Sequence, residues 1–271
     1  MAGSSQGDRS GLGIFAAELA AARAAASLTQ EELASRVTFS ASTISMVEQR
    51  RRVPSADLAR RCDEVLGLPG TLRRLQQHAQ AAPLPAWFRP YAEVEAAATV
   101  LRSWQPMVID GLAQTEDYAR ALLAEQPGTS EDQLEDRVAA RISRQEILAR
   151  AEPPVVTMIM DEAVLIRPVG GPKVMHGQLV HLEALARQPD VTVLIVPLAS
   201  GAHCGLLGAF AVAETQASRT GFMESPDEGL IVEHPPAVGR LLRALDILAS
   251  EALPRAASRD LILRRADEHD S

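Results

Sequence analysis

The fold is constrained most by residues 28–52, LTQEELASRVTFSASTISMVEQRRR. Thr29 and Glu32 have the spacing of a capping box, in which each side chain bonds the backbone amide of the other residue and starts a helix. Ser40 is a favourable N-cap for a second short helix, and three arginines follow that helix. Two short helices joined by a tight turn and followed by cations are the pattern of a helix that lies in a DNA groove beside the phosphates.

Three further helices are predicted around this pair, over Gly13–Ala26, from Pro54-Ser55 to Gly67, and from Thr71 to about Ala82. Apolar residues recur with helical spacing along them, which indicates one buried face on each helix. The side chains expected to face the core include Phe15, Leu19, Ala22, Leu33, Ala34, Val37, Ile44 and Val47. Residues 11–82 are therefore expected to form an all-α five-helix domain, after a disordered tail over residues 1–10.

The charge distribution separates this head from the rest of the chain. Net charge is −8 overall, which argues against nucleic-acid binding if the chain is taken as a whole. Residues 1–80, however, carry 10 arginines against 8 acids, whereas residues 81–271 carry 17 basic residues against 27 acids. Because an acidic body repels DNA, binding is expected to depend on the local arginine cluster and to weaken with salt.

Other features bound the cellular setting. No apolar run reaches the ~20 residues that cross a bilayer, and the N-terminus lacks the apolar core of a signal peptide. Cys62 and Cys204 fall in different predicted domains, which favours free thiols. We therefore expect a cytoplasmic protein, associated with the nucleoid when bound to DNA.

Residues 83–271 have an α+β pattern. Pro83 and Pro85 break the fifth helix and start a junction over residues 83–104, whose aromatic side chains are expected to pack it onto a domain over residues 105–271. A small mixed sheet is predicted, covered by helices. The predicted strands are Val155–Met160, Val191–Pro197, Phe210–Glu214, Thr220–Glu224 and Gly229–Glu233, with a short extended stretch at Met107–Leu112. The predicted helices are residues 90–104, 116–124, 130–150, 161–165, 173–187 and 237–253, followed by a polar helical tail.

The head resembles the helix-turn-helix fold of phage repressors and Xre-type regulators. The residues that carry the resemblance are Leu28, Thr29, Gln30, Leu33, Ala34, Ser40, Thr43, Ile44, Ser45, Glu48 and the arginines that follow. The resemblance implies phosphate contacts from Gln30, Thr43, Arg50, Arg51 and Arg52, and base contacts from Ala41, Ser42 and Met46, with Ser40, Ser45 and Gln49 alongside. The alternative is a helical bundle with no role on DNA.

The head departs from the family pattern in two ways. Ala41 and Met46 cannot form the bidentate hydrogen bonds that identify guanine or adenine, so modest base discrimination is expected. Ser27 and Thr38 stand where this family often has glycine. If both positions need a positive φ, each costs on the order of 1 kcal/mol.

The body resembles the C-terminal domain of actinobacterial regulators described as antitoxin-like Xre transcription factors. The matching stretches are Trp104–Pro106, Gly111–Arg120, Arg137–Leu148, Asp161–Ala163, Arg167–Gly171 and Val191–His203. The resemblance implies a transcriptional regulator, often encoded beside a small partner protein. It assigns no chemistry to the body.

The body offers no convincing catalytic or metal motif. His176 and His181 would lie about 140° apart around a helix, so they share no face. His203 and Cys204 are adjacent, which favours a loop histidine and a small thiol over a nucleophile with its base. Gly170-Gly171 lacks the rest of a phosphate-binding fingerprint and indicates a turn. We expect no metal, no cofactor and no catalytic residue.

Acidic residues at predicted strand ends leave one site open. Glu162 and Glu224 end predicted strands, and Arg167 and His203 could join them around a pocket for a ligand or partner; the alternative is solvated strand ends. The leading prediction is a homodimeric DNA-binding regulator, since one head offers few contacts. A small protein partner or a ligand bound to the body would change its DNA affinity. The alternatives are an enzyme acting on a nucleotide-like ligand with a DNA-targeting head, and an antitoxin that mainly neutralises a partner protein.

Overall fold

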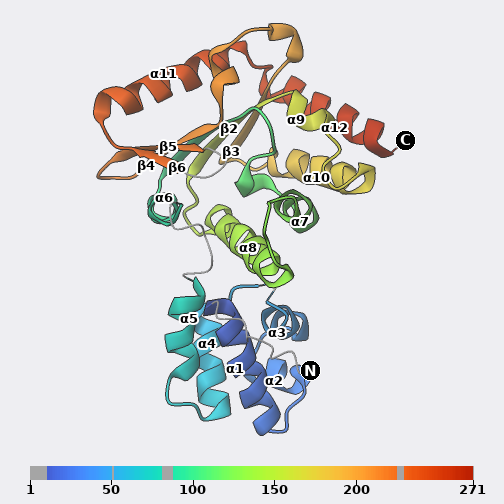
Figure 1. Ribbon diagram of the computed structural model, residues 1–271, viewed down its shortest axis with the longest axis vertical. Coiled ribbons are helices and arrows are strands. Elements are labelled where there is room, and N and C mark those ends of the chain that lie inside the picture. The colour runs from blue at the N-terminus through green and yellow to red at the C-terminus, as the bar shows by residue number, and fades with distance from the viewer. Residues whose placement is uncertain (1–10, 51, 81–87, 225–228, 271) are drawn as a thin grey trace. The chain divides into compact units, whose positions relative to one another are not determined.

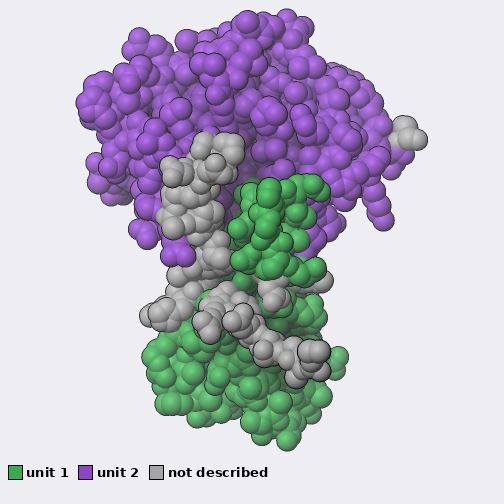
Figure 2. Space-filling model, in the orientation of Figure 1, with its two compact units in different colours: residues 1–84, 123–143 green, residues 85–122, 144–271 purple. Residues whose placement is uncertain are grey.

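The computed structural model describes residues 11–50, 52–80, 88–224 and 229–270. Its contacts divide the chain into two compact units, coloured separately in Figure 2. Unit 1 comprises residues 1–84 and 123–143, and unit 2 comprises residues 85–122 and 144–271. The sequence analysis assigned all of residues 105–271 to one domain, whereas the helix over 131–143 packs with the head in unit 1. The chain therefore passes between the units three times.

Unit 1 consists of six helices within the described residues: α1 (Gly11–Ala25), α2 (Gln30–Val37), α3 (Ala41–Glu48), α4 (Ala56–Leu66), α5 (Thr71–Gln80) and most of α8 (Glu131–Arg144) (Figure 1). The predicted capping box of α2 and the predicted N-cap Ser40 of α3 are confirmed. The predicted start and end of the next helix are also confirmed: Ser55 caps α4, and Gly67 ends it in left-handed backbone. The predicted end of the fifth helix, residues 81–82, lies outside the described residues. No single described helix is long and apolar enough to cross a membrane; α1 and α2 pass that test only as a pair bent by 98°.

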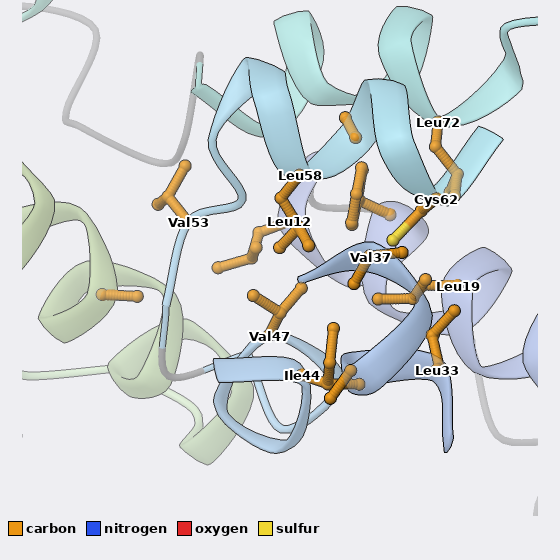
Figure 3. Close-up of a cluster of buried hydrophobic side chains, with 14 of the residues drawn as sticks. Leu12, Leu19, Leu33, Val37, Ile44, Val47, Val53, Leu58, Cys62 and Leu72 are labelled. Carbon is orange, nitrogen blue, oxygen red and sulfur yellow. The ribbon is translucent and has the colours of Figure 1, made fainter. Parts of the chain in front are cut away.

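The core of unit 1 lies where the apolar faces of α1 to α5 meet (Figure 3). The largest of its fully buried side chains are Leu12, Phe15, Leu19, Leu33, Ile44, Leu58 and Leu72. Ala139 and Ala140 of α8 belong to the same cluster, at 1% and 3% exposure. These two alanines of α8 therefore contribute to this core, although more than fifty residues separate α8 from α5.

The start of α5 is fixed by a residue of α4. Asp63 is buried, and its carboxylate accepts hydrogen bonds from the backbone amides of Leu72 (2.8 Å) and Arg73 (3.0 Å). Free amides at a helix start need acceptors, and a carboxylate also suits the positive end of the helix dipole. Asp63 therefore ties α5 to α4 at the point where Thr71 was predicted to begin the helix.

Unit 2 is built around one six-stranded sheet with the order β3-β2-β1-β4-β5-β6. The strands are β1 (Val100–Gln105), β2 (Val155–Asp161), β3 (Val191–Val196), β4 (Phe210–Glu214), β5 (Arg219–Glu224) and β6 (Gly229–Val232). β1, β2 and β3 run parallel, and β4, β5 and β6 continue antiparallel, so the predicted mixed sheet and α+β class are confirmed. The helices are α6 (Arg89–Ala96), α7 (Glu116–Ala124), α9 (Ala163–Ile166), α10 (Pro172–Leu185), α11 (Pro235–Glu251) and α12 (Arg255–Asp270), with 3-10 turns η1 (Gly111–Ala113), η2 (Gln145–Ala149), η3 (Leu198–Ser200) and η4 (Cys204–Leu207).

One sequence prediction in this region is wrong. The helix predicted over residues 90–104 ends at Ala96, and residues 100–105 form β1, the strand that joins the parallel and antiparallel halves of the sheet. β1 hydrogen-bonds on both sides, to β2 and to β4. Pairing with these distant segments decides its structure over local helical preference. The predicted extended stretch after it contains η1 instead of a strand.

Helices cover both faces of the sheet. Val238, Leu245 and Leu248 of α11 pack on one face, in a core that includes Trp104 and Val212. On the opposite face Phe222 of β5 stacks on Tyr91 of α6, with ring centroids 4.6 Å apart. α10 and α12 pack against each other, as Figure 1 shows, and α12 also contacts β3.

The two edge strands of the sheet, β3 and β6, differ in what their outward backbone groups bond to. Along β3, the Ile195 amide donates to the Ser258 hydroxyl (3.1 Å), and the Ile195 carbonyl accepts from the Leu253 amide (2.8 Å). Arg255 also donates to the Val191 carbonyl (3.1 Å). The segment before and within α12 thus occupies the backbone groups of this edge. β6 forms the other edge.

Candidate nucleic-acid interface

The outer face of α3 presents four side chains in one stripe. Ser42, Ser45, Met46 and Gln49 lie at positions i, i+3, i+4 and i+7, so they share a side of the helix. Ser42 and Gln49 are exposed, and the other two are half-buried. The Gln49 amide donates to the Ser45 hydroxyl at 3.0 Å. This is the face that a helix-turn-helix domain places in the major groove.

In the first turn of α3, some of the side chains cap the helix or pack on the core of unit 1. Ser40 accepts from the Thr43 amide (3.1 Å), and the two hydroxyls lie 2.9 Å apart. Thr43 is only 7% exposed, and Ala41 packs against the core of unit 1. Of these three predicted DNA contacts, only Ser40 is exposed. A phosphate contact by Thr43 would have to use the 7% of this residue that is exposed.

An ion pair joins the ends of α1, α2 and α3. The Arg23 guanidinium contacts both carboxylate oxygens of Glu48, at 2.6 and 2.9 Å, and also donates to the Leu28 carbonyl. Gln30 donates to the same carboxylate at 2.7 Å. The hydrogen bonds that Arg23 donates to Glu48 raise the pKa of Arg23 above its ordinary value, although burial opposes this. The acid at the end of α3 is thus neutralised within the head, and Gln30 is held at the start of α2.

Sequence analysis named Glu48 as a motif residue but did not identify Arg23, which lies 25 positions away. A helical pattern shows that Arg23 stands in the last turn of α1, where a cation is favourable. It does not show which acid from another helix will meet it. Only the packing of α1 against α3 brings the two together.

The first of the arginines that follow α3 has left-handed backbone. Arg50 has φ of 64° and is half-buried, and Arg52 is exposed. Arg51 lies outside the described residues. The change of direction ends α3 and starts the segment that leads to α4.

Ser27 and Thr38, the two non-glycine departures, both adopt left-handed backbone, with φ of 55° and 59°. The positive φ considered from the sequence is therefore present at both. The Thr38 hydroxyl donates to the Val37 carbonyl (2.7 Å) and contacts the Arg61 guanidinium. These bonds offset part of the backbone cost at Thr38.

In unit 2 two of the four predicted pocket residues, Glu162 and His203, hold the fold together. Glu162 accepts from Arg265 of α12 (2.7 Å) and from the Leu198 amide (3.0 Å). Burial pushes the pKa of Glu162 up, but these hydrogen bonds outweigh it and leave the pKa below its ordinary value. Glu162 therefore stays ionised and links α12 to the end of β3.

His203 is held between two other buried groups. Its Nε2 lies 3.3 Å from the Asp161 carboxylate, and its Nδ1 accepts from the Gly205 amide. The Trp104 ring meets the imidazole edge-on at 5.2 Å between centroids, and the histidine side chain is 2% exposed. This arrangement fixes the imidazole as an anchor for the loop that carries η4.

The structure does not gather all four predicted pocket residues. Asp161, which precedes Glu162, is the last residue of β2, and Glu224 is the last residue of β5. Both lie at the same end of the strands, because β2 and β5 point in the same direction. Three strand spacings of ~4.8 Å, about 14 Å in all, separate these strands. Arg167 is exposed after α9. His203 contacts Asp161, the residue before Glu162, so His203 and Glu162 lie near each other. Glu224 lies apart from both.

A groove of about 610 Å³ lies elsewhere, between the β4–β5 hairpin and the first turns of α11. Its lining includes Glu214, Thr220, Glu233 and Val238. Sequence analysis placed Glu233 at a strand end but did not expect a groove there. Within the described residues, no three His, Cys, Asp or Glu side chains are grouped so that they could hold a metal ion.

Comparison with known families separates a head from a body, although the match to the body also spans residues 123–143 of unit 1. Residues 14–76 match a family described as a helix-turn-helix domain. Residues 88–264, roughly two thirds of the 271-residue chain, match the family described as a domain of unknown function, DUF5753. No curated protein and no solved structure matches the chain significantly. The protein therefore belongs to the DUF5753 family and carries a helix-turn-helix DNA-binding domain at its N-terminal end.

Proposed function

We propose that this protein is a transcriptional regulator of the Xre type, related to the antitoxin-like regulators of actinobacteria. It binds operator DNA in the cytoplasm as a homodimer, and unit 2 adjusts that binding when a small protein partner or ligand engages it. The observation that carries the proposal is the stripe of Ser42, Ser45, Met46 and Gln49 on the outer face of α3, within a domain that matches a helix-turn-helix family.

Charge supports the same function. Residues 1–80 carry 10 arginines against 8 acids, and the ion pair between Arg23 and Glu48 neutralises the acid at the end of α3. Arg50, Arg51 and Arg52 follow directly and supply positive charge for phosphates. We infer that these arginines provide affinity, and that the stripe on α3 provides the base contacts.

The first experiment measures binding of the full chain to its own upstream DNA over a salt series. The test variant changes Arg50, Arg51 and Arg52 to alanine, and a matched control removes the same charge from α4 and α5 by changing Arg60, Arg73 and Arg74. Loss of specific binding and a salt slope shallower by about 2–3 are expected only in the test variant. Equal losses in both variants would show that only net charge matters, and specific binding unaffected in the test variant would refute the arginine contacts.

A second experiment addresses the bases. Ser42 and Met46 offer only weak or apolar contacts, so the wild-type preference is expected to be modest. Met46→Arg adds a group that can bond guanine bidentately, and a binding-site selection should show a changed preference at one position per half-site. An unchanged preference would mean that α3 does not contact bases there.

A further inference from the structure

Among the described residues, nothing pairs with the outer edge of β6, whereas the outer edge of β3 bonds to other parts of the chain. The β3 edge bonds to Leu253, Arg255 and Ser258 of the same chain. β6 pairs with β5 on its inner side, and no described residue forms a backbone hydrogen bond with its outer side. Its sequence, Gly-Leu-Ile-Val, contains none of the lysine or proline residues that commonly protect an edge. An uncovered apolar edge strand of this kind is a template for a strand from another chain.

An apolar row leads to this edge. Trp104, Phe210, Met223 and Leu230 are opposite one another on four adjacent strands, so their side chains lie on the same face, the one that α11 covers. Trp104 and Phe210 are buried, but Met223 is 42% and Leu230 61% exposed. The cover by α11 does not extend over the last two members of the row.

Charge at the two ends of β6 indicates the kind of strand that fits. Glu224 is opposite Gly229 at one end, and Glu233 follows Val232 at the other. Both glutamates are exposed, and no described residue forms an ion pair with either. A second copy paired antiparallel would bring Glu233 near the Glu224 end of its partner's strand, where like charges repel. Positive residues at both ends of the incoming segment would instead be attracted.

The groove beside α11 extends the same edge. The register of β6 with β5 stops at the pair of Val232 and Gly221, so Thr220 and Arg219 have no β6 residue opposite them. The groove of about 610 Å³ is lined by these two residues and by Glu233 and Glu214. Arg219 is already paired with Glu214 at 2.6 Å, which leaves Glu233 to receive a cation from the incoming segment.

We propose that the outer edge of β6 binds an extended segment of a partner protein as a seventh strand, with apolar residues at its centre and arginine or lysine at its ends. The apolar residues contact Met223 and Leu230, and the basic ends contact Glu224 and Glu233. This deepens the proposed function, since it rests on unit 2 receiving a protein partner and names the surface and the chemistry of that partner.

The test uses the full chain and three labelled peptides in fluorescence anisotropy titrations. The first has alternating valine and threonine flanked by two arginines at each end, the second has glutamates in place of the arginines, and the third carries N-methyl groups on alternate amides of the first. The first is expected to bind at least about tenfold more tightly than either of the others, because only it offers both complementary charge and a backbone able to pair.

Variants locate the site. Leu230→Asp should weaken the arginine peptide at least about tenfold, whereas Val180→Asp, at a position 45% exposed on α10, should leave it unchanged. Met223→Asp, at a position 42% exposed and opposite Leu230, serves as a second variant if Leu230→Asp does not fold. Binding that is absent up to about 1 mM, equal for all three peptides, or unaffected by both variants overturns the proposal.

Light scattering tests the competing occupant. A dimer that separates in Leu230→Asp but persists in Val180→Asp would assign the edge to a second copy and overturn the proposal. Specific DNA binding is measured on the same samples. If the wild-type chain shows no specific DNA binding, the proposed regulator is refuted, whatever the peptides do. If the chain binds DNA specifically but does not bind the arginine peptide, only the proposed strand addition is refuted.

Discussion

At the scale of single residues, the head keeps three side chains in left-handed backbone that glycine would adopt at less cost: Ser27, Thr38 and Arg50. The cost of that conformation for an L-residue is about 1–2 kcal/mol. Thr38 recovers part of it through hydrogen bonds to Val37 and Arg61. For Ser27 the structure shows no comparable side-chain bond among the described residues, so relief of strain should be measurable there.

Ser27→Gly is expected to raise the free energy of unfolding by about 0.5–1 kcal/mol, because removal of the left-handed strain exceeds the extra entropy of glycine in the unfolded chain. Ser35→Gly, at an exposed position inside α2, is the matched control and should lower it by about 0.5 kcal/mol. Chemical denaturation of both variants decides the point. A loss of stability in Ser27→Gly would mean that the serine supplies a contact worth more than the strain.

The two cysteines should differ in reactivity. Cys62 is fully buried, and burial with the nearby Asp63 and Glu48 raises the pKa of its thiol to about 12. Cys204 is exposed. A thiol reagent at pH 8 should therefore titrate one thiol in the native chain, none in Cys204→Ser, and both cysteines of the wild type only in denaturant. Rapid reaction of two native thiols would contradict the buried position of Cys62.

At the scale of elements, α11 packs on β5 beside a glycine of that strand. A Cβ at Gly221 would lie 2.6 Å from Leu241 Cδ1, whereas a Cβ at Gly239, in α11 itself, would meet nothing within 4 Å. Because Cδ1 is the end of a flexible, half-buried side chain that can turn aside, Gly221→Ala should cost about 1 kcal/mol. Gly239→Ala should stabilise by up to about 1 kcal/mol through helix propensity. Thermal unfolding compares the pair, and equal effects would mean that α11 accommodates the methyl group by shifting.

The individual elements show how much of the fold could be predicted from the sequence. The caps and apolar spacing of α2, α3 and α4 act within a few residues, so their positions were predicted closely. β1 was not, because its structure depends on pairing with β2 and β4, which lie about 55 and 110 residues further along the chain. The outer face of α3 followed from helical spacing. The ion pair between Arg23 and Glu48 and the open edge at β6 did not, since both arise from packing between distant segments.

At the scale of the whole molecule, the head is not a contiguous stretch of chain. Ala139 and Ala140 of α8 belong to its core, and Leu123–Ser143 belong to unit 1. The matched family for the head ends at residue 76, so that match alone would not include α8. The stability of the DNA-binding unit therefore depends on residues that the sequence places within the body.

Ala139→Leu tests this dependence. The added side chain has no room at a position 1% exposed, so unit 1 should lose about 1–3 kcal/mol of stability. Hydrogen exchange should show faster opening of α3 and α4, with the sheet of unit 2 unchanged. Ala184→Leu, at an exposed position on α10, is the control and should change neither unit. Protection of α3 that is unaltered by Ala139→Leu would separate α8 from the head.

The interrupted course of unit 1 also sets an order of synthesis. After residue 84 a ribosome must add residues 85–122, which belong to the other unit, before Leu123–Ser143 can appear. At about 5–20 residues per second, synthesis of residues 85–143 takes roughly 3–12 s, during which the first five helices are without α8. A nascent chain halted in this interval carries α3 but not the complete core that supports it, so only chains elongated well into the body carry a finished head.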